Sequence, residues 1–125
     1  MIEEQYVSFE VAKLLKNKHF PQDSFRCHYV NGIKQFEYRC GFGDNDIIAP
    51  TQEIVMRWLR KVYKISIRPR YDEVEDENEH IHYVWFYDIL SMKPYKILKE
   101  IEQGYNTYEN ACESAIKYCL ENLIN

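Results

Sequence analysis

The sequence has no apolar run long enough to cross a membrane and no motif of a common enzyme class. Its longest apolar run, residues 83–87, has the length of a strand, whereas a membrane-spanning helix needs about 20 residues. The opening residues MIEEQY are acidic and lack the apolar segment of a targeting signal. The motifs G-x-S-x-G, H-E-x-x-H and the phosphate loop are all missing. We therefore expect a cytoplasmic protein that is not an enzyme and binds no cofactor.

The four cysteines, Cys27, Cys40, Cys112 and Cys119, have no C-x-x-C spacing. Cys112 and Cys119 are seven residues apart, on one face of a predicted helix, which indicates core packing and a reduced protein. The net charge of −4 gives no general attraction to nucleic acid or to anionic membranes. Tyrosine is unusually frequent, with 11 residues in 125, and its ring suits half-exposed sheet faces and interfaces alike.

Residues 49–71 predict a helix that runs directly into a strand, and the other elements can be arranged around this pair. Thr51 is placed as an N-cap, and the apolar residues that follow at helical spacing predict one buried stripe of core residues: Ile54, Val55, Trp58, Leu59 and Val62. Ile65 and Ile67 then alternate with polar residues, as in a half-buried strand. Pro69 lacks an amide donor, so this strand is expected at a sheet edge.

The remaining elements follow from turns and periodicity. A helix is predicted over residues 9–17, and a last helix follows the candidate caps Asn106 and Thr107, with apolar residues at helical period over 111–123. Asn-Gly at 31–32 predicts a hairpin with strands near 25–30 and 33–39. The Gly- and Asp-rich residues 40–50 predict a connecting loop. Residues 95–103 fit either a strand or a helix, and a strand is favoured because the strand before them needs a second partner.

Six acids among the eight residues 72–79 predict a solvated, mobile hairpin loop. Residues 80–90 then predict a central strand, because large side chains occupy both of its faces. One face is apolar or aromatic and is expected to meet the helices: Ile81, Tyr83, Trp85, Tyr87 and Ile89. The other face is mixed and is expected to be partly open: His82, Val84, Phe86, Asp88 and Leu90.

The predicted order is therefore α-β-β-α-β-β-β-α. Strands joined by short connections predict an antiparallel sheet. The fold class is accordingly α+β, as a single domain over residues 1–125 with two layers: an antiparallel sheet of about three to five strands with the helices packed on one face.

Three separated blocks carry a family resemblance: YVSFEVAKLLK at 6–16, APTQEIVMRWLRK at 49–61 and YNTYENACESAIKYCLENLI at 105–124. The chain resembles a family of small uncharacterised proteins encoded by phages, prophages and other mobile elements of gut anaerobic bacteria. The resemblance implies a small cytoplasmic accessory protein and carries no known activity or site. The family segment before the last helix is strand-like, whereas the acidic residues 72–79 depart from the family pattern.

The sharpest local feature is a group of six cations within fourteen residues, with no acid among them: Arg57, Arg60, Lys61, Lys64, Arg68 and Arg70. The even-numbered residues of the strand at 64–70 are expected to share a sheet face with His82 and Phe86. A basic face with an aromatic ring can hold a nucleic-acid strand by phosphate contacts and stacking. The same charges also suit a solvated sheet edge that resists strand addition, and the acidic run could neutralise them.

His80 and His82 have a spacing that some metal sites use, but no third ligand can be named, so no metal site is predicted. Tyrosines, two tryptophans and a partly open sheet face suit a protein interface. The sequence therefore predicts a non-enzymatic accessory protein that acts through protein contacts, as a homodimer or with a host or mobile-element protein. The alternative is a small nucleic-acid-binding protein that uses the basic residues.

Overall fold

The computed structural model describes residues 4–22, 27–30, 32–36, 47–101 and 103–125. In chain order, the first four elements are α1 (Phe9–Asn17), β1 (Cys27–Val30), β2 (Ile33–Phe36) and β3 (Ile47–Ile48). They are followed by α2 (Gln52–Trp58), β4 (Ile65–Glu75), β5 (Ile81–Met92), β6 (Tyr95–Glu100) and α3 (Tyr108–Tyr118). Two π-helical segments, η1 (Leu59–Tyr63) and η2 (Cys119–Leu123), extend α2 and α3. The predicted α+β class is confirmed.

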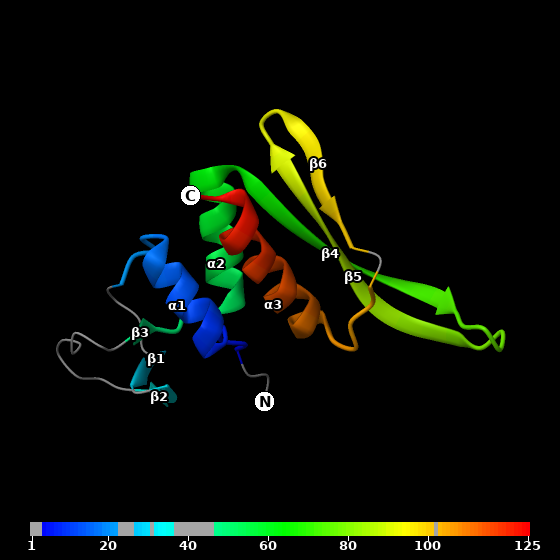
Figure 1. Cartoon of the computed structure of the whole chain (residues 1–125), viewed down its shortest axis with the longest axis horizontal. Coiled ribbons are helices and arrows are strands. Elements are labelled where there is room, and N and C mark those ends of the chain that lie inside the picture. The colour runs from blue at the N-terminus through cyan, green and yellow to red at the C-terminus, as the bar shows by residue number, and fades with distance from the viewer. Residues whose placement is uncertain (1–3, 23–26, 31, 37–46, 102) are drawn as a thin grey trace.

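The described strands form two antiparallel sheets of three strands, ordered β2–β1–β3 and β4–β5–β6, instead of the one sheet expected. The three helices lie between these sheets, with α1 against β3 and α3 against β4 and β5 (Figure 1). The short strand β3, where a loop was expected, pairs with β1 and completes the first sheet immediately before α2.

Each of the three described helices begins at a side-chain cap, and the cap predicted at Thr51 is confirmed. Ser8 Oγ accepts a hydrogen bond from the Val11 amide at 3.2 Å, and Thr51 Oγ1 accepts one from the Ile54 amide at 3.2 Å. Thr107 Oγ1 caps α3 in the same way, at 3.0 Å from the amide of Asn110. Each cap satisfies one of the amides that the first helical turn leaves unpaired.

The α2 stripe is only partly core. Val55 and Leu59 are fully buried, whereas Ile54 is 38% exposed and Val62 is 56% exposed, so the prediction of both as core residues was wrong. At η1 the helix changes to i→i+5 hydrogen bonding, which alters the rotation per residue and turns Val62 away from the core. Among the described residues, no helix is both long and apolar enough to span a membrane.

The second sheet is built on the long β4–β5 hairpin, whose register pairs Ile65 with Ser91 and Glu75 with Ile81. Residues 72–75 are therefore strand and not loop, and the turn is limited to residues 76–80. The acidic residues of β4 suggested a loop, but they pair with largely apolar residues of β5, so the hairpin is longer than predicted. The strand prediction for residues 95–103 is confirmed over β6, at residues 95–100.

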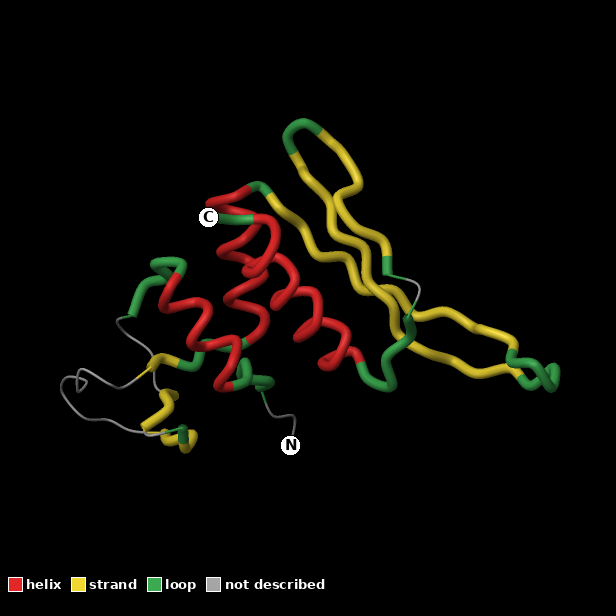
Figure 2. Tube along the Cα trace, viewed as in Figure 1, coloured by secondary structure: helices red, strands yellow, loops and turns green. Residues whose placement is uncertain are grey.

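The far half of this hairpin extends beyond the helices as an arm (Figure 2). Tyr87 and Ile89 are buried against the helical layer, and Trp85 packs edge-on against Tyr108. Ile81 is 58% exposed, so the expectation that this whole face of β5 meets the helices fails at its first residues. The reason is length: β5 has twelve residues, and α3 covers only its middle and later part.

Candidate functional site

Four of the predicted site residues share one face of the second sheet, as expected: Arg68, Arg70, His82 and Phe86. Arg68 lies opposite Asp88 in the β4–β5 register, and Arg70 lies opposite Phe86. Directly opposed residues in an antiparallel pair point to the same face of the sheet. This outer face is the one turned away from the helices, because the neighbouring residues Ile67 and Ile89 are in the core.

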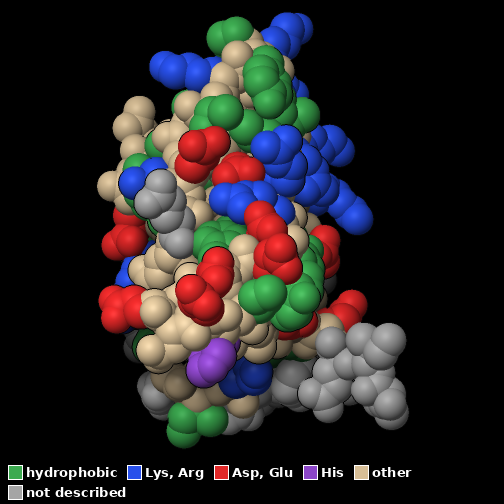
Figure 3. Space-filling model, turned by 90° about the vertical axis from the view of Figure 1, so that its right-hand side faces the viewer, with side chains coloured by type: hydrophobic (Ala, Val, Ile, Leu, Met, Phe, Trp, Pro, Cys, Tyr) green, Lys and Arg blue, Asp and Glu red, His purple; other side chains and the backbone are tan. Residues whose placement is uncertain are grey.

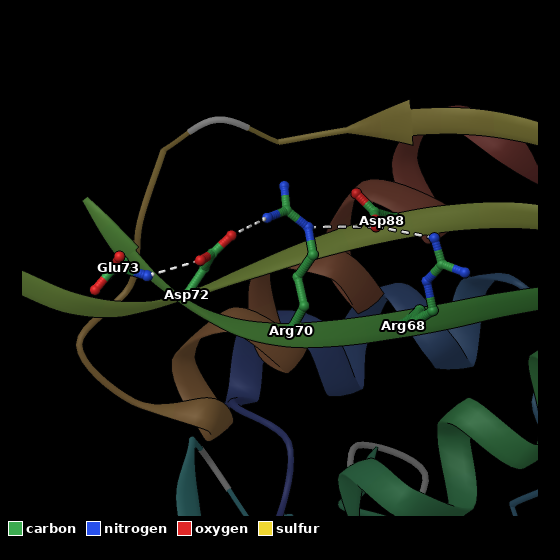
Figure 4. Close-up of polar contacts among 5 residues, drawn as sticks. All are labelled: Arg68, Arg70, Asp72, Glu73 and Asp88. Carbon is green, nitrogen blue, oxygen red and sulfur yellow. Dashed lines mark hydrogen bonds and ion pairs between the residues drawn. The ribbon is translucent and has the colours of Figure 1, made fainter. Parts of the chain in front are cut away.

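Asp88 organises this face, and both arginines reach the same oxygen of its carboxylate (Figure 4). The Oδ2 atom lies 3.2 Å from Nη2 of Arg68 and 3.4 Å from Nε of Arg70. The Asp88 side chain is only 6% exposed, whereas those of the arginines are 55% and 40% exposed. Its Oδ1 atom is buried and has no hydrogen-bond partner in the described structure. In the sequence, this cluster could be found from Asp88, a single acid inside a largely apolar strand.

Phe86 does not offer a stacking surface. It is 6% exposed, and the guanidinium carbon of Arg70 lies 4.8 Å from its ring centroid. The expected aromatic platform for nucleic-acid bases is therefore covered. Asp72 holds Arg70 from the other side at 3.5 Å, so the acidic run neutralises this part of the predicted patch. The charges of Arg68 and Arg70 are compensated within the sheet.

The other four predicted cations lie on α2, η1 and the residue that follows. Arg57 and Lys61 are exposed, Arg60 is half-buried, and Lys64 is exposed with a left-handed φ of 58°. Lys64 Nζ donates to the carbonyl oxygen of Lys61 at 3.0 Å. In the described structure none of the four has a carboxylate partner. The predicted patch is therefore divided into a neutralised part on β4 and an unpaired part beside η1.

The fold adds two lysines to the unpaired part. The amide of Met92 donates to the carbonyl oxygen of Lys64 at 2.8 Å, which places the β5–β6 turn next to the end of η1. Lys93 lies in that turn and Lys96 lies on β6, both exposed. We name this region the basic end and define it by five residues: Arg60, Lys61, Lys64, Lys93 and Lys96. The sequence analysis missed Lys93 and Lys96 because only the tertiary fold joins the two segments.

His82 belongs to the opposite end of the sheet. It pairs with Val74, four residues beyond Arg70 along β4, a separation of about 13 Å by strand rise. Its Nε2 atom lies 2.8 Å from Oδ2 of Asp76, and this hydrogen bond lowers the pKa of the Asp76 carboxyl. His82 therefore stabilises the β4–β5 turn and does not join the cations.

The arm carries the opposite charge from the basic end. We name this region the acidic tip and define it by five exposed carboxylates: Glu73, Glu75, Asp76, Glu77 and Glu79. Figure 3 views the sheet from the side of the arm and shows Lys and Arg side chains gathered in its upper part, with Asp and Glu side chains across the middle. The sheet is thus electrically polarised along its length although the net charge is only −4.

Exposed apolar side chains gather at the same two ends. Of the ten large apolar residues that the described structure exposes, eight lie there. The four beside the acidic tip are Tyr71, Val74, Ile81 and Tyr83, and the four beside the basic end are Val62, Met92, Tyr95 and Ile97. Tyr71 and Tyr83 stack with ring centroids 5.9 Å apart while each stays more than half exposed. Apolar clusters of this kind on a water-exposed sheet are typical of interaction surfaces.

The described residues hold no group of His, Cys, Asp and Glu side chains able to bind a metal ion. Burial raises the pKa of the Cys112 thiol to about 11 and that of Cys119 to about 12, so both stay protonated and inert at neutral pH. A shallow cleft of about 260 Å³ lies beside the N-terminal ends of α2 and α3. Tyr108 donates to Glu53 there at 3.2 Å, and burial raises the pKa of its phenol, so the phenol is not activated as a nucleophile.

No family model matches the chain, and no curated protein or solved structure matches it. The resemblance to proteins of phages and mobile elements therefore stays a prediction.

Proposed function

We propose that this chain is a non-enzymatic accessory protein, of the phage or mobile-element kind that its sequence resembles, and that it acts through protein–protein contacts made by the β4–β5–β6 sheet. The observation that carries the proposal is the distribution of exposed apolar residues. Seven of the ten in the described structure lie on the strands of this sheet, toward its two ends, and an eighth, Val62, lies on η1 beside one end. Two of the seven, Tyr71 and Tyr83, form a stacked pair.

Side-chain type supports a protein partner. Interface centres are enriched in Tyr and Met, and three of the eight residues are tyrosines and one is Met92. The free edge of β4 carries charged residues and Pro69, which disfavour the addition of a partner strand. The contact is therefore made by side chains and not by extension of the sheet.

The test is affinity purification from the native host, with the chain as bait. The Tyr71→Ser/Tyr83→Ser variant removes the exposed ring pair, and Ile33→Ser is the matched control, because Ile33 is 64% exposed on the other sheet. We expect a stoichiometric partner, or a second copy of the chain, with the parent and the control but not with the double variant. Equal recovery with the double variant, or no partner for the parent protein, would overturn the proposal.

Nucleic-acid binding is the second candidate, and it is favoured by the cations of α2 and the basic end that lack carboxylate partners. Phosphate contacts need unpaired Lys and Arg, and each contact increases the salt dependence of binding. A gel shift with single- and double-stranded DNA and RNA at low salt tests it. We expect weak, salt-sensitive shifts that Lys61→Glu/Lys93→Glu abolishes; no shift at tens of micromolar protein would exclude this function.

A further inference from the structure

We propose that the partner of this sheet binds the helix-side face of the arm through an extended segment that carries arginines. The inference rests on the proposed function, since it gives the chemistry of the partner at the same sheet. It follows from three properties of the described structure: a continuous row of aromatic rings on one face of the arm, carboxylates among the exposed side chains of that face, and a similar set of groups on the outer face that binds an arginine of this chain.

Six residues form one face of the arm, which we name the arm face. The β4–β5 register pairs them directly: Tyr71 with Trp85, Glu73 with Tyr83, and Glu75 with Ile81. Opposed residues point to the same face, and so do alternate residues of one strand, so the arm face continues the face that carries Ile67 and Ile89. The helices bury those two isoleucines and leave most of the arm face exposed, because the arm extends beyond them (Figure 2).

Aromatic rings follow one another along the arm face. Ring centroids lie 5.9 Å apart between Tyr83 and Tyr71, 5.0 Å apart between Tyr71 and Trp85, and 5.2 Å apart between Trp85 and Tyr108. The row begins at the exposed Tyr83 and ends at Tyr108, which is half-buried at the start of α3. Aromatic rings attract cations, because their quadrupole makes the ring faces negative. The row therefore suits a planar cation.

The arm face is also negatively charged and carries no Lys, Arg or His. Glu73 and Glu75 are exposed, and neither has a cationic partner in the described structure. At the other end of the row, the Tyr108 hydroxyl donates to the carboxylate of Glu53 at 3.2 Å. Such a surface repels the phosphates of nucleic acids and of anionic membranes. A partner that binds here is therefore a protein segment with positive charge.

The outer face of the same sheet shows how such groups bind a guanidinium. There the guanidinium carbon of Arg70 lies 4.8 Å from the centroid of Phe86, while its nitrogen atoms lie 3.4 Å from Asp88 and 3.5 Å from Asp72. The arm face combines aromatic rings and carboxylates in the same way, and within the described structure no cation contacts its rings. Arginine suits it better than lysine, because a planar guanidinium stacks on a ring while its N–H groups bind carboxylates.

The spacing of the carboxylates defines the shape of the segment. Glu73 and Glu75 are two residues apart on one strand, or about 7 Å by strand rise. Alternate side chains of an extended segment are separated by the same distance, so arginines at alternate positions match the two carboxylates. The alternating arginines of β4 itself, Arg68 and Arg70, are already held by Asp88. The segment is therefore assigned to another protein and not to a second copy of this chain.

Titration of the full chain with synthetic peptides gives the first test. The probes are three peptides of equal length in which Ser alternates with Arg, with Lys or with Glu. The indole N–H signal of Trp85 in the NMR spectrum reports on the arm face, and that of Trp58, which packs against Phe20 and Tyr63, reports on a distant site.

We expect the Arg peptide to shift the Trp85 signal and not the Trp58 signal. The Lys peptide should bind about threefold more weakly, because an ammonium group does not stack on a ring. The Glu peptide should not bind. No shift of Trp85 with the Arg peptide at about 1 mM, or an equal shift with the Glu peptide, overturns the inference.

A pair of glutamine variants locates the contact. Glu73→Gln/Glu75→Gln removes both charges of the arm face with little change in side-chain size, so the Arg peptide should bind about fivefold more weakly. The matched control is Glu100→Gln/Glu121→Gln, which removes the same charge from exposed residues outside the arm and should bind as the parent does. Far-ultraviolet circular dichroism verifies that both variants remain folded. Equal binding by the arm variant and the control overturns the inference.

Affinity purification with the same variants separates this inference from the proposed function. If a host partner is lost with Tyr71→Ser/Tyr83→Ser but fully retained with Glu73→Gln/Glu75→Gln, the proposed function stands and this inference alone fails. If the parent retains no partner while the Arg peptide still binds the arm face, the proposed function fails and the chemistry of the arm face stands. A parent dimer that Glu73→Gln/Glu75→Gln dissociates would identify a second copy as the occupant and overturn the inference.

Discussion

The stability of the Asp88 cluster gives the most direct test of the structure. In Arg68→Met/Arg70→Met, the Asp88 carboxylate loses both groups that contact it, while its Oδ1 atom already has no partner in the described structure. Breaking a buried ion pair from one side costs about 3–5 kcal/mol, because a buried charge is left uncompensated. The arginine side chains here are 55% and 40% exposed, so water can partly replace them. We therefore expect about 3 kcal/mol, the lower end of that range.

Urea unfolding followed by tryptophan fluorescence measures this loss. About 3 kcal/mol is a large part of the roughly 5–15 kcal/mol that stabilises a typical domain. Each single arginine change should cost only about 1 kcal/mol, because the other guanidinium still holds Oδ2. The control is Arg57→Met, an exposed cation with no carboxylate partner in the described structure, which should change stability by less than about 0.5 kcal/mol.

A compensating change makes the reasoning refutable. Adding Asp88→Asn to the double arginine variant removes the stranded charge, so it should recover about 2 kcal/mol. If Asp88→Asn recovers nothing, or if the double variant is as stable as the Arg57→Met control, then the buried carboxylate is not what the arginines stabilise. Non-additivity between Asp88 and the arginines is the expected sign of a shared contact.

Three further predictions concern other described contacts. Gly104→Ala should cost about 1–3 kcal/mol in urea unfolding, because a Cβ there would lie 2.6 Å from a methyl carbon of Val84. The lowered pKa of Asp76 means that its hydrogen bond with His82 stabilises the β4–β5 turn above the ordinary carboxyl pKa and is lost as pH falls through the lowered value. Protection of the turn amides from hydrogen exchange, measured by NMR relative to the intrinsic exchange rate at each pH, should be constant from pH 7 and fall only below about pH 4. Native Cys119 should not react with a thiol reagent at pH 8, since burial raises its pKa to about 12, and reaction without denaturant would contradict its placement.

Local patterns predicted the elements well because their causes act within a few residues. Thr51 and Thr107 cap helices through amides three residues away, and the alternation of Ile65 and Ile67 places both in the core. The strand at residues 95–100 was correct for a less local reason: β5 needed a partner on its second edge. The first hairpin agrees with its Asn-Gly signal over β1 and the first residues of β2, while residues 23–26, 31 and 37–46 lie outside the described structure.

The candidate site was predicted less well because it depends on contacts between distant segments. Six of its eight predicted residues are the cations within residues 57–70. They are close in sequence, but the fold separates them into two groups. Neutralisation of Arg68 by Asp88 crosses twenty residues, and the approach of Lys93 to Lys64 requires the β5–β6 turn to fold back on η1. A periodic pattern over a few residues cannot reveal contacts between residues so far apart in the sequence. Phe86 was placed on the correct face, but its cover by Arg70 depends on a side-chain conformation.

The sequence by itself determined the α+β class, the helix start at Thr51, the alternating strand that begins at Ile65, and the signs of charge of residues 57–70 and 72–79, because hydrogen-bonding caps, side-chain alternation and charge are local properties. Only the tertiary structure decided that the strands divide into two sheets around the helices. It also decided that the acidic residues extend β4 and do not form a loop, and that the arm leaves Tyr71 and Tyr83 in water. These outcomes depend on which parts of the sheets the helices are long enough to cover, and this is decided only when the whole chain packs.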